Sequence, residues 1–473
     1  MLNRRHLLLG GTAVAAAAVL MSASPALGAP ATTLEPEGVA WLKANAMPLA
    51  TAEPGSDFKD LEPLRRSIGN ARVVGLGEAT HGTREFFQLK HRMIEYCVSQ
   101  LGFTMIGFEA AYGETLAVND YVLHGKGNAE DVVAGMRFWT WNTEEVVALV
   151  EWVRAWNLAH DRKVKFYGFD MQSGTAALPH LLAYLRRVAP ALASASEPIL
   201  APLVDVTVWY FDGLPPAAEQ EKVLAQIKAV VDAFAAERTA WIGQTGELDW
   251  RLARQSAIVL GQYARLLQIY GEKGIVKGVE WRDRCMADNV HALLEAEGPA
   301  ARALLWAHNG HVQNSPLPEF ANMGSFLHAE LAADYLAVGF AFNQGSFRAL
   351  DRERNLRDHT VGPAPAEFLD AALAATAIPL FALDLKRVPA DGPVAAWMAD
   401  TPPQRDIGAL FDADQDLGNA LAADPRDRFG VLLFVETTTA ARGVRRPAAV
   451  AAATLPGMVR TPAPVPMGTE LRM

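Results

Sequence analysis

A glutamate and a histidine lie three residues apart at the end of the segment Arg72–Gly82 (RVVGLGEATHG), where a short apolar run stops at a glycine. An apolar run bounded by glycines is typical of a buried strand that turns sharply at its end. The carboxylate of Glu78 can orient the imidazole of His81, fix its tautomer and stabilise its charged form. The segment therefore predicts a general base held by a carboxylate. The alternative is an ordinary glutamate and histidine in a surface loop.

The residues after this loop predict a helix from Glu85 to Leu101, because apolar side chains recur at helical spacing. Glu78 and His81 then lie between a strand and a helix, where open α/β sheets bind ligands, and His81 is expected to be exposed to that cleft. Lys90 lies on the apolar stripe of the helix. A buried cation needs anionic partners, which the nearby carboxylates would supply, unless the side chain extends to solvent.

Two further strands are predicted at Thr104–Phe108 and Val164–Phe169, and an acidic residue follows each of them, Glu109 and Asp170. Helical patterns separate the strands, which favours parallel pairing. In a parallel sheet the carboxyl ends of the strands share one edge. Glu78, Glu109 and Asp170 are therefore expected to gather there as candidate catalytic residues.

Two histidines follow a fourth predicted strand, Ala303–Ala307. His308 and His311 are three residues apart, with a glycine between them, so both can point at one spot. They can serve as metal ligands, proton-transfer groups or oxyanion donors, or simply cap a loop. A catalytic zinc site needs three protein ligands and an open position. Since the metalloprotease pattern His-Glu-x-x-His is absent from the sequence, we expect no metal or other cofactor.

Two familiar motifs are excluded by the sequence. Gly75 and Gly77 imitate the start of a dinucleotide-binding fingerprint, but Thr80 stands where the third glycine belongs. A glutamate inside the turn would also repel a pyrophosphate. The pattern Gly-x-Ser-x-Gly of a serine nucleophile elbow does not occur in the chain.

The composition is that of a globular protein: 473 residues, of which 51% are hydrophobic and 20% are charged. The net charge is −10 and no basic stripe is interleaved with aromatic residues, so we expect no nucleic-acid partner. The two cysteines, Cys97 and Cys285, lie in helical apolar patterns. Buried free thiols are therefore expected, although one disulfide stays possible.

The amino terminus predicts export. Arg4 and Arg5 precede a leucine run, a stretch rich in Gly, Ala and Val that ends at Leu20, and small residues around Ala29. This order is typical of a bacterial twin-arginine signal. An uncleaved anchor is the alternative, but the stretch is short and alanine-rich beside the roughly 20 residues of a membrane span. We expect removal of residues 1–28 and a periplasmic or secreted protein without stable membrane association.

The rest of the chain predicts an α/β fold, with a mostly parallel sheet flanked by helices and a helical subdomain inserted in the middle. Strand patterns occur in residues 29–175 and 301–439, whereas residues 176–300 show long helical periodicities. Residues 440–473 are rich in Ala and Pro and are expected to form a surface-laid or disordered tail. The remaining predicted strands are Tyr335–Phe340, Pro379–Leu383 and Gly430–Val435.

Together these motifs resemble those of the erythromycin esterase family. The matching segments are Gly77–Gly82, Glu85–Phe87, Gly107–Glu109, Gly168–Asp170, Met286–Val290, Ala307–His311 and Phe434–Thr437. The resemblance covers roughly residues 35 to 439. It implies an α/β fold with a helical subdomain, and hydrolytic opening of a macrolide lactone by activated water, without a required metal.

The resemblance also implies roles for single residues. The general base of the family corresponds to His81, its motif glutamates to Glu78 and Glu109, and its paired histidines to His308 and His311. One position departs from the pattern, because the antibiotic-resistance enzymes have an arginine on the helix where this chain has Lys90. Arginine binds carboxylates through a planar fork, whereas lysine is a point charge. The expected partner is a small-molecule ester or lactone.

A binding protein is the competing interpretation. The family's fold is similar to that of bacterial cell-surface proteins that bind iron or haem, and an exported binding protein would use the same His/Glu cluster as ligands. Carboxylates outnumber soft ligands at the predicted strand ends, which favours proton transfer over haem binding.

Overall fold

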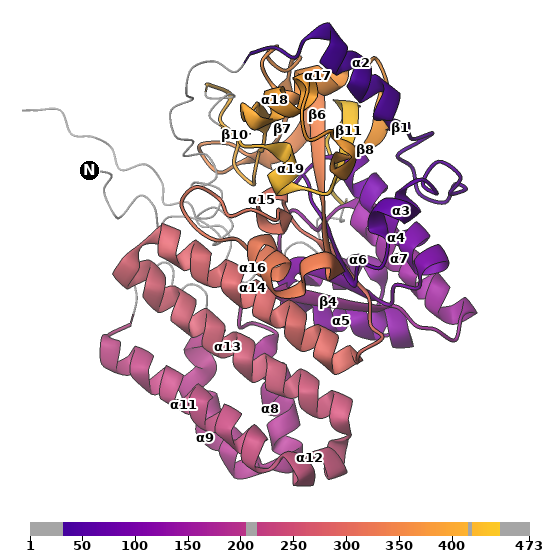
Figure 1. Cartoon of the computed structure of the whole chain (residues 1–473). Coiled ribbons are helices and arrows are strands. Elements are labelled where there is room, and N and C mark those ends of the chain that lie inside the picture. The colour runs from indigo at the N-terminus through magenta and orange to yellow at the C-terminus, as the bar shows by residue number, and fades with distance from the viewer. Residues whose placement is uncertain (1–31, 205–214, 415–418, 445–473) are drawn as a thin grey trace, which may run out of the picture.

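The computed structural model describes residues 32–204, 215–414 and 419–444. It shows a central sheet covered by helices and a further group of helices that extends away from the sheet (Figure 1). The predicted signal segment, residues 1–28, and the tail from residue 445 lie outside the described residues. The first residues of the predicted tail pair with the body of the protein, Ala440 with Thr83 and Gly443 with Thr143.

Among the described residues, nine strands form the main sheet, in the order β1-β8-β11-β6-β2-β5-β3-β4, with β7 paired to β6. Their bounds are β1 Met47–Pro48, β2 Val73–Leu76, β3 Met105–Ala111, β4 Lys165–Asp170, β5 Ala303–Trp306, β6 Tyr335–Leu350, β7 Leu356–Val361, β8 Leu380–Asp384 and β11 Val431–Thr438. A separate pair consists of β9 (Pro403–Arg405) and β10 (Ala420–Ala422). Pairing is parallel from β11 through β6, β2, β5 and β3 to β4. The predicted α/β fold with a mostly parallel sheet is confirmed.

Each predicted strand is present, but three differences have physical causes. β3 continues to Ala111, so Glu109 lies inside the strand and not after it. β6 continues from Phe340 to Leu350 through a half-buried stretch whose polar residues hide the strand pattern. Its hairpin partner β7 was not predicted, because most of its residues are exposed and its sequence, LRDHTV, is largely polar.

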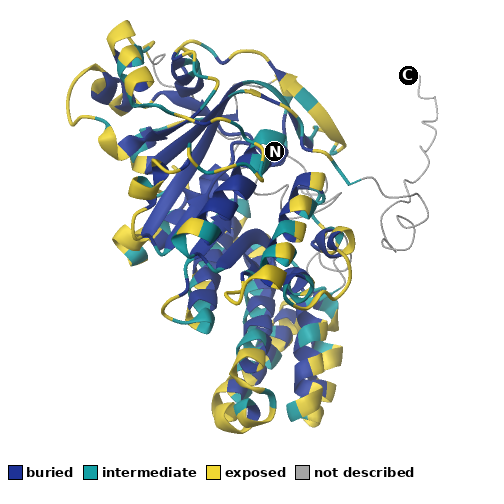
Figure 2. Cartoon of the chain, turned by 90° about the vertical axis from the view of Figure 1, so that its right-hand side faces the viewer, coloured by how far each residue is buried: buried dark blue, intermediate teal, exposed yellow. Residues whose placement is uncertain are grey.

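Neighbouring strand residues serve two different hydrophobic cores, one on each face of the sheet. Val73 and Met105 belong to one core, whereas Val74 and Ile106 belong to the other. Helices cover both faces, which explains why the strands are apolar at nearly every position. Figure 2 shows the sheet as a buried layer beneath helices whose outer surfaces are exposed.

Helices α4 (Arg84–Leu101) and α7 (Glu144–Ala159) contribute to the same core as Val74. Glu144–Ala159 matches the span of its apolar pattern, and Thr143 caps it by accepting a hydrogen bond from the backbone N–H of Val146. The helices flanking the sheet are α2 Pro36–Asn45, α3 Leu64–Ile68, α5 Tyr112–His124, α6 Ala129–Gly135, α15 Asn309–Val312, α16 Met323–Leu331, α17 Leu369–Ala374, α18 Pro393–Ala399 and α19 Pro425–Arg428.

Between β4 and β5 the described residues form helices and no strand. These are α8 Ala177–Val188, α9 Pro190–Leu200, α11 Ala217–Ala236, α12 Arg238–Thr245, α13 Glu247–Lys273 and α14 Ile275–Glu297. Figure 1 shows this group below the sheet, with α14 returning the chain to it. α14 begins at Ile275 and therefore places residues 281–284 in its second and third turns.

The environment of the two cysteines agrees with the sequence-based expectation. Cys97 and Cys285 are buried and unpaired, as expected for free thiols. None of the helices in the described ranges has both the length and the apolarity that crossing a bilayer requires.

Candidate active site

The loop after β2 buries Glu78 and His81 because neighbouring segments pack directly against its glycines. A side chain at position 77 would overlap the side-chain oxygen of Asn309, and one at position 82 would overlap the carbonyl oxygen of Arg348. The backbone N–H of Asn309 also donates to the carbonyl oxygen of Glu78, at 2.9 Å. Residues that follow β5 therefore hold the loop in place. His81 is only 6% exposed, so the expectation that it faces an open cleft is wrong.

Glu78 is the centre of one group of side chains, the Glu78 cluster, which also contains His81, Lys90 and Trp306. Glu78 Oε1 lies 2.7 Å from His81 Nδ1, and Oε2 accepts hydrogen bonds from Lys90 Nζ at 2.6 Å and Trp306 Nε1 at 3.0 Å. Lys90 is fully buried and donates also to the carbonyl oxygen of Ala307, at 3.2 Å. The sequence-based expectation that Lys90 is buried against a carboxylate is confirmed.

The charges of the Glu78 cluster fix the tautomer of His81. Burial alone would raise the pKa of Glu78, but the charge of Lys90 and the hydrogen bond from His81 hold that pKa below its usual value. Burial lowers the pKa of Lys90 to about 8 in spite of the attraction of Glu78. Because the ionised Glu78 can only accept, Nδ1 of His81 carries the proton in the neutral ring, which leaves the lone pair on Nε2. No described residue forms a hydrogen bond with Nε2.

A second group, the Arg282 cluster, occupies the ends of β3 and β4 and contains Arg282, Glu109, Asp170, His311 and Asp283. Arg282 is 1% exposed, and its Nη2 donates to Glu109 Oε1 and to Asp170 Oδ2, each at 2.7 Å. Asp170 also accepts from the backbone N–H of Met171, at 2.7 Å. Burial raises the pKa of Glu109, yet His311 and then Arg282 hold that pKa well below its usual value. Both strand-end carboxylates thus share one buried cation.

A bulge in β3 directs Glu109 into this cluster. Phe108 pairs with Gly168 and Ala111 with Asp170, so β3 contains one residue more than β4 between these two pairs. Such a bulge re-aims the side chain next to it. A side chain at position 168 would overlap the carbonyl oxygen of Ala110, which explains the glycine there.

His311 is held in the charged form. Its Nδ1 lies 2.7 Å from Asp283 Oδ1, and its Nε2 lies 3.3 Å from Glu109 Oε1 and 3.1 Å from Arg282 Nη1. Burial lowers the pKa of His311, but the two carboxylates outweigh burial and raise it to about 10. A charged imidazole donates from both nitrogens, so Nε2 donates to Glu109 and the contact with Arg282 is not a hydrogen bond.

His308 is different from His311 although it lies only three residues away. It caps α15, with Nδ1 accepting from the N–H of Gly310 at 3.2 Å. Its Nε2 lies 3.2 Å from the carbonyl oxygen of Ile407 and 3.3 Å from Asp406 Oδ1. Burial lowers the pKa of His308 to about 4, so the ring is neutral. Both ring nitrogens are engaged, and neither is placed to donate to an oxyanion or to transfer a proton.

Thus the structure brings all seven sequence-predicted residues to one edge of the sheet, in the two clusters and their border. His308 joins the clusters, because its backbone N–H donates to Glu109 Oε2 at 3.1 Å and its ring lies 5.0 Å from that of His81. As sequence reasoning expected, strands β2, β5, β3 and β4 are parallel neighbours.

Sequence reasoning missed four residues of the site. Arg282 and Asp283 lie on the buried side of α14 together with Cys285 and Met286. A charged residue on an apolar stripe is also the signal that identified Lys90. Trp306 was assigned to a strand without a hydrogen-bonding role. Asp406, which accepts from Arg428 Nη2 at 2.6 Å, gives no signal because it is far from every motif.

The residues of the site pair with cations and with each other. Across the described ranges, no three His, Cys, Asp or Glu side chains are placed so that they could hold a metal ion. Among these side chains, His81 Nε2 is the ring nitrogen of the Glu78 cluster that can accept a proton.

Comparison with known sequences decides the family. The sequence profile of the family described as erythromycin esterase matches residues 98–438, well over half of the chain. This chain belongs to the erythromycin esterase family. It is 26% identical to erythromycin esterase type II of Escherichia coli over 338 residues, which are 66% of this chain and 78% of that protein. It is 24% identical to a putative hydrolase, YbfO, of Bacillus subtilis over 369 residues, 73% of this chain and 80% of that protein.

Solved structures share the fold. The crystal structure of a Bacillus cereus protein has a TM-score of 0.78 at 24% identity, covering 86% of this chain and 99% of that one. An erythromycin esterase mutant in its open conformation, EreC, has a TM-score of 0.63 at 16% identity, covering 83% and 97%. The family and its relatives support a hydrolase of the erythromycin esterase type, and the structural likeness supports the α/β fold.

Proposed function

We propose that this protein is an exported carboxylic ester hydrolase in which His81 activates water to cleave an ester or a macrolide lactone. The observation that carries the proposal is the state of His81. Its Nδ1 is bound to Glu78 at 2.7 Å, whereas its Nε2 has no hydrogen-bond partner among the described residues. A histidine with one nitrogen anchored to a carboxylate and the other unoccupied has the arrangement of a general base.

The chemistry balances without a cofactor. His81 Nε2 takes a proton from water, and the water oxygen bonds to the acyl carbon while the carbonyl electron pair moves to its oxygen. Glu78 stabilises the imidazolium that forms. The oxyanion then collapses, the bond to the leaving oxygen breaks, and that oxygen receives the proton from Nε2. One water is consumed, and the products are an acid and an alcohol, which remain in one molecule when the substrate is a lactone.

The two clusters take different parts in this proposal. Lys90 is fully buried behind Glu78, so it positions Glu78 and does not touch the substrate. The Arg282 cluster holds two cations, Arg282 and His311, against three carboxylates, and both nitrogens of His311 are engaged. It is therefore assigned to holding Glu109 beside the base and not to donating to the oxyanion. Glu109 interacts electrostatically with both His81 and His311, which supports the placement of that cluster beside the base.

Export is the second part of the proposal. Arg4, Arg5 and the small residues before Pro30 support a twin-arginine signal, with a mature protein that starts between Leu27 and Ala31. Replacement of both arginines by lysine should block export. Periplasmic and cytoplasmic fractions would be compared by immunoblotting, and an unchanged periplasmic level would refute the assignment.

The substrate class is tested with the purified wild-type protein and a panel of esters that includes simple aryl and alkyl esters and a macrolide lactone. Turnover should release one acid per ester, and a lactone should gain the mass of one water. If the protein hydrolyses no ester and no lactone, the proposed function is wrong. If the protein hydrolyses simple esters but no lactone, ester hydrolysis stands and the macrolide lactone is refuted as a substrate.

A further inference from the structure

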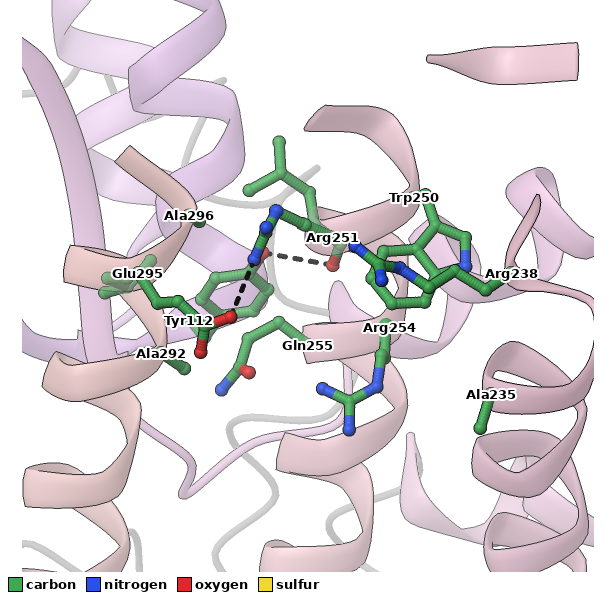
Figure 3. A pocket seen from close by; sticks show the side chains of 12 residues that line it. Tyr112, Ala235, Arg238, Trp250, Arg251, Arg254, Gln255, Ala292, Glu295 and Ala296 are labelled. Carbon is green, nitrogen blue, oxygen red and sulfur yellow. Dashed lines mark hydrogen bonds and ion pairs between the residues drawn. The ribbon is translucent and has the colours of Figure 1, made fainter. Parts of the chain in front are cut away.

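A pocket with a volume of about 400 Å³ lies in the helical group, away from the site described above (Figure 3). Side chains from α11, α12, α13 and α14 line it, together with Tyr112 at the start of α5. The pocket is separate from the catalytic clusters. Arg282 and Ala292 both lie on α14, ten residues apart, which corresponds to about 15 Å along the helix axis.

The charge of this pocket is opposite to that of the whole protein. Three arginines line it, Arg238, Arg251 and Arg254, against one carboxylate, Glu295. The net charge of the chain is −10. A local excess of guanidinium groups in an acidic protein favours an anionic ligand.

The three arginines are not equally occupied. Arg251 bridges Glu247 and Glu295 at 2.9 and 3.1 Å, and Arg238 makes a long contact of 3.3 Å with Glu247. The side chain of Arg254 forms no hydrogen bond or ion pair with any residue in the described ranges. Figure 3 shows its guanidinium group within the pocket, beside Gln255. Arg254 is therefore the cation most open to a ligand.

Trp250 supplies a second, independent observation. It is only 7% exposed, and its indole N–H is buried without a hydrogen-bond partner among the described residues. The guanidinium groups of Arg238 and Arg254 lie 5.3 and 5.9 Å from its ring centroid. A buried unpaired donor costs free energy that a ligand acceptor would recover. Ala292 and Ala296 of α14 line one side of the pocket, and Ala235 of α11 lines the other.

We propose that this pocket binds a small organic anion, a carboxylate with an apolar or aromatic body. Arg254 holds the carboxylate through its planar fork, and the apolar body lies against the Trp250 ring. The contact between a guanidinium group and a carboxylate is bidentate and directional. The Trp250 ring favours a ligand with an apolar body, which inorganic anions lack.

The test uses the purified protein and three probes: benzoate, benzyl alcohol as its neutral counterpart, and inorganic phosphate. Binding is measured by calorimetry and by tryptophan fluorescence for wild type, Arg254→Gln and Arg186→Gln. The last variant is the matched control, since Arg186 is an exposed arginine of α8 paired with Glu197. We expect saturable benzoate binding that weakens about tenfold or more in Arg254→Gln, equal to about 1.4 kcal/mol, and stays unchanged in the control.

Because benzoate also resembles the product of an esterase, the Arg254 variant decides which site it occupies. Equal benzoate affinity in wild type and Arg254→Gln, or no saturable binding, would overturn the proposal. If benzyl alcohol binds as tightly as benzoate, the pocket does not require a negative charge. If phosphate binds as tightly as benzoate, the pocket does not require an apolar body. If Arg254→Gln melts early, Arg254→Lys keeps the charge, loses the fork and should still weaken benzoate binding.

Discussion

The two clusters at the sheet edge use similar side chains in different ways. In the Glu78 cluster the carboxylate is saturated by three donors, but His81 keeps one ring nitrogen without a partner. In the Arg282 cluster, both nitrogens of His311 face carboxylates. The cation Arg282 is shared between Glu109 and Asp170. The first arrangement can exchange a proton, whereas the second holds charge in place. The comparison assigns proton transfer to one cluster and fixed electrostatics to the other.

The largest expected effect comes from removing the shared cation. Arg282→Gln leaves Asp170 buried without its counter-charge and leaves Glu109 with His311 alone, which should cost about 3–5 kcal/mol of unfolding free energy. The matched control is Arg284→Gln on the same helix, whose ion pairs with Asp288 and Glu330 are partly exposed and should contribute at most about 1 kcal/mol. Urea unfolding measures both. Equal stability of the two variants would mean that the Arg282 cluster does not hold charge as described.

The two histidines of the His308–His311 pair should respond to pH in opposite directions. The pKa of His308 falls from 6.5 to about 4 on folding, so the unfolded chain binds more protons between those values and stability is lost as pH falls. The loss approaches about 3 kcal/mol at pH 4. The pKa of His311 rises to about 10, so its stabilisation is complete below pH 6.5 and is lost as pH rises towards 10.

Urea unfolding from pH 4.5 to 9.5 separates these contributions. His308→Asn keeps an oxygen acceptor for the N–H of Gly310 and should flatten the acid side of the stability profile. His311→Gln should flatten the alkaline side. If His308→Asn retains the full acid slope, the neutral state assigned to His308 is wrong.

Neutralising the carboxylate that anchors the base should have a smaller effect. Glu78→Gln keeps an oxygen that accepts from His81 Nδ1 but no longer stabilises the imidazolium, so kcat/KM should fall by about ten- to a hundredfold, less than on loss of the base itself. Glu85→Gln makes the same change seven residues later, where the carboxylate faces Thr439, and should leave kcat/KM unchanged. Wild-type kcat/KM in Glu78→Gln would show that the charge of Glu78 does not contribute to catalysis.

The smallest expected effect is that of chelation. Both clusters satisfy their carboxylates with Lys, Arg and His, so exhaustive chelation should leave ester hydrolysis unchanged. The same protein should show no visible absorption band. Activity that is lost on chelation and restored by one metal would replace the proposed mechanism, and a haem-type absorption band would favour the binding protein over the enzyme.

The sequence predicted the sheet and the Glu78 cluster because their signals are local. Strands buried on both faces are short apolar runs, and Glu78, His81 and Lys90 lie within thirteen residues of one another. The parallel pairing of helix-separated strands then placed Glu109, Asp170 and His308 at the same edge.

The rest of the site depends on contacts that no local pattern contains. Arg282 reaches Asp170 from 112 positions away, and Asp406 reaches His308 from a loop without a motif. The raised pKa of His311 also depends on such partners, Asp283 and Glu109, whereas burial lowers the pKa of His308. The length of β6 was missed for the related reason that its second half is stabilised by pairing with β7 rather than by an apolar sequence.

The most direct test of the central claim is the ester hydrolysis of His81→Asn. Asparagine keeps a donor near the position of Nδ1 but has no atom that replaces Nε2 as a base. The account predicts that kcat/KM falls by about 10²–10⁴ while the melting temperature stays close to that of wild type. Wild-type kcat/KM in a normally folded His81→Asn protein would contradict the account, because another group would then have to activate the water.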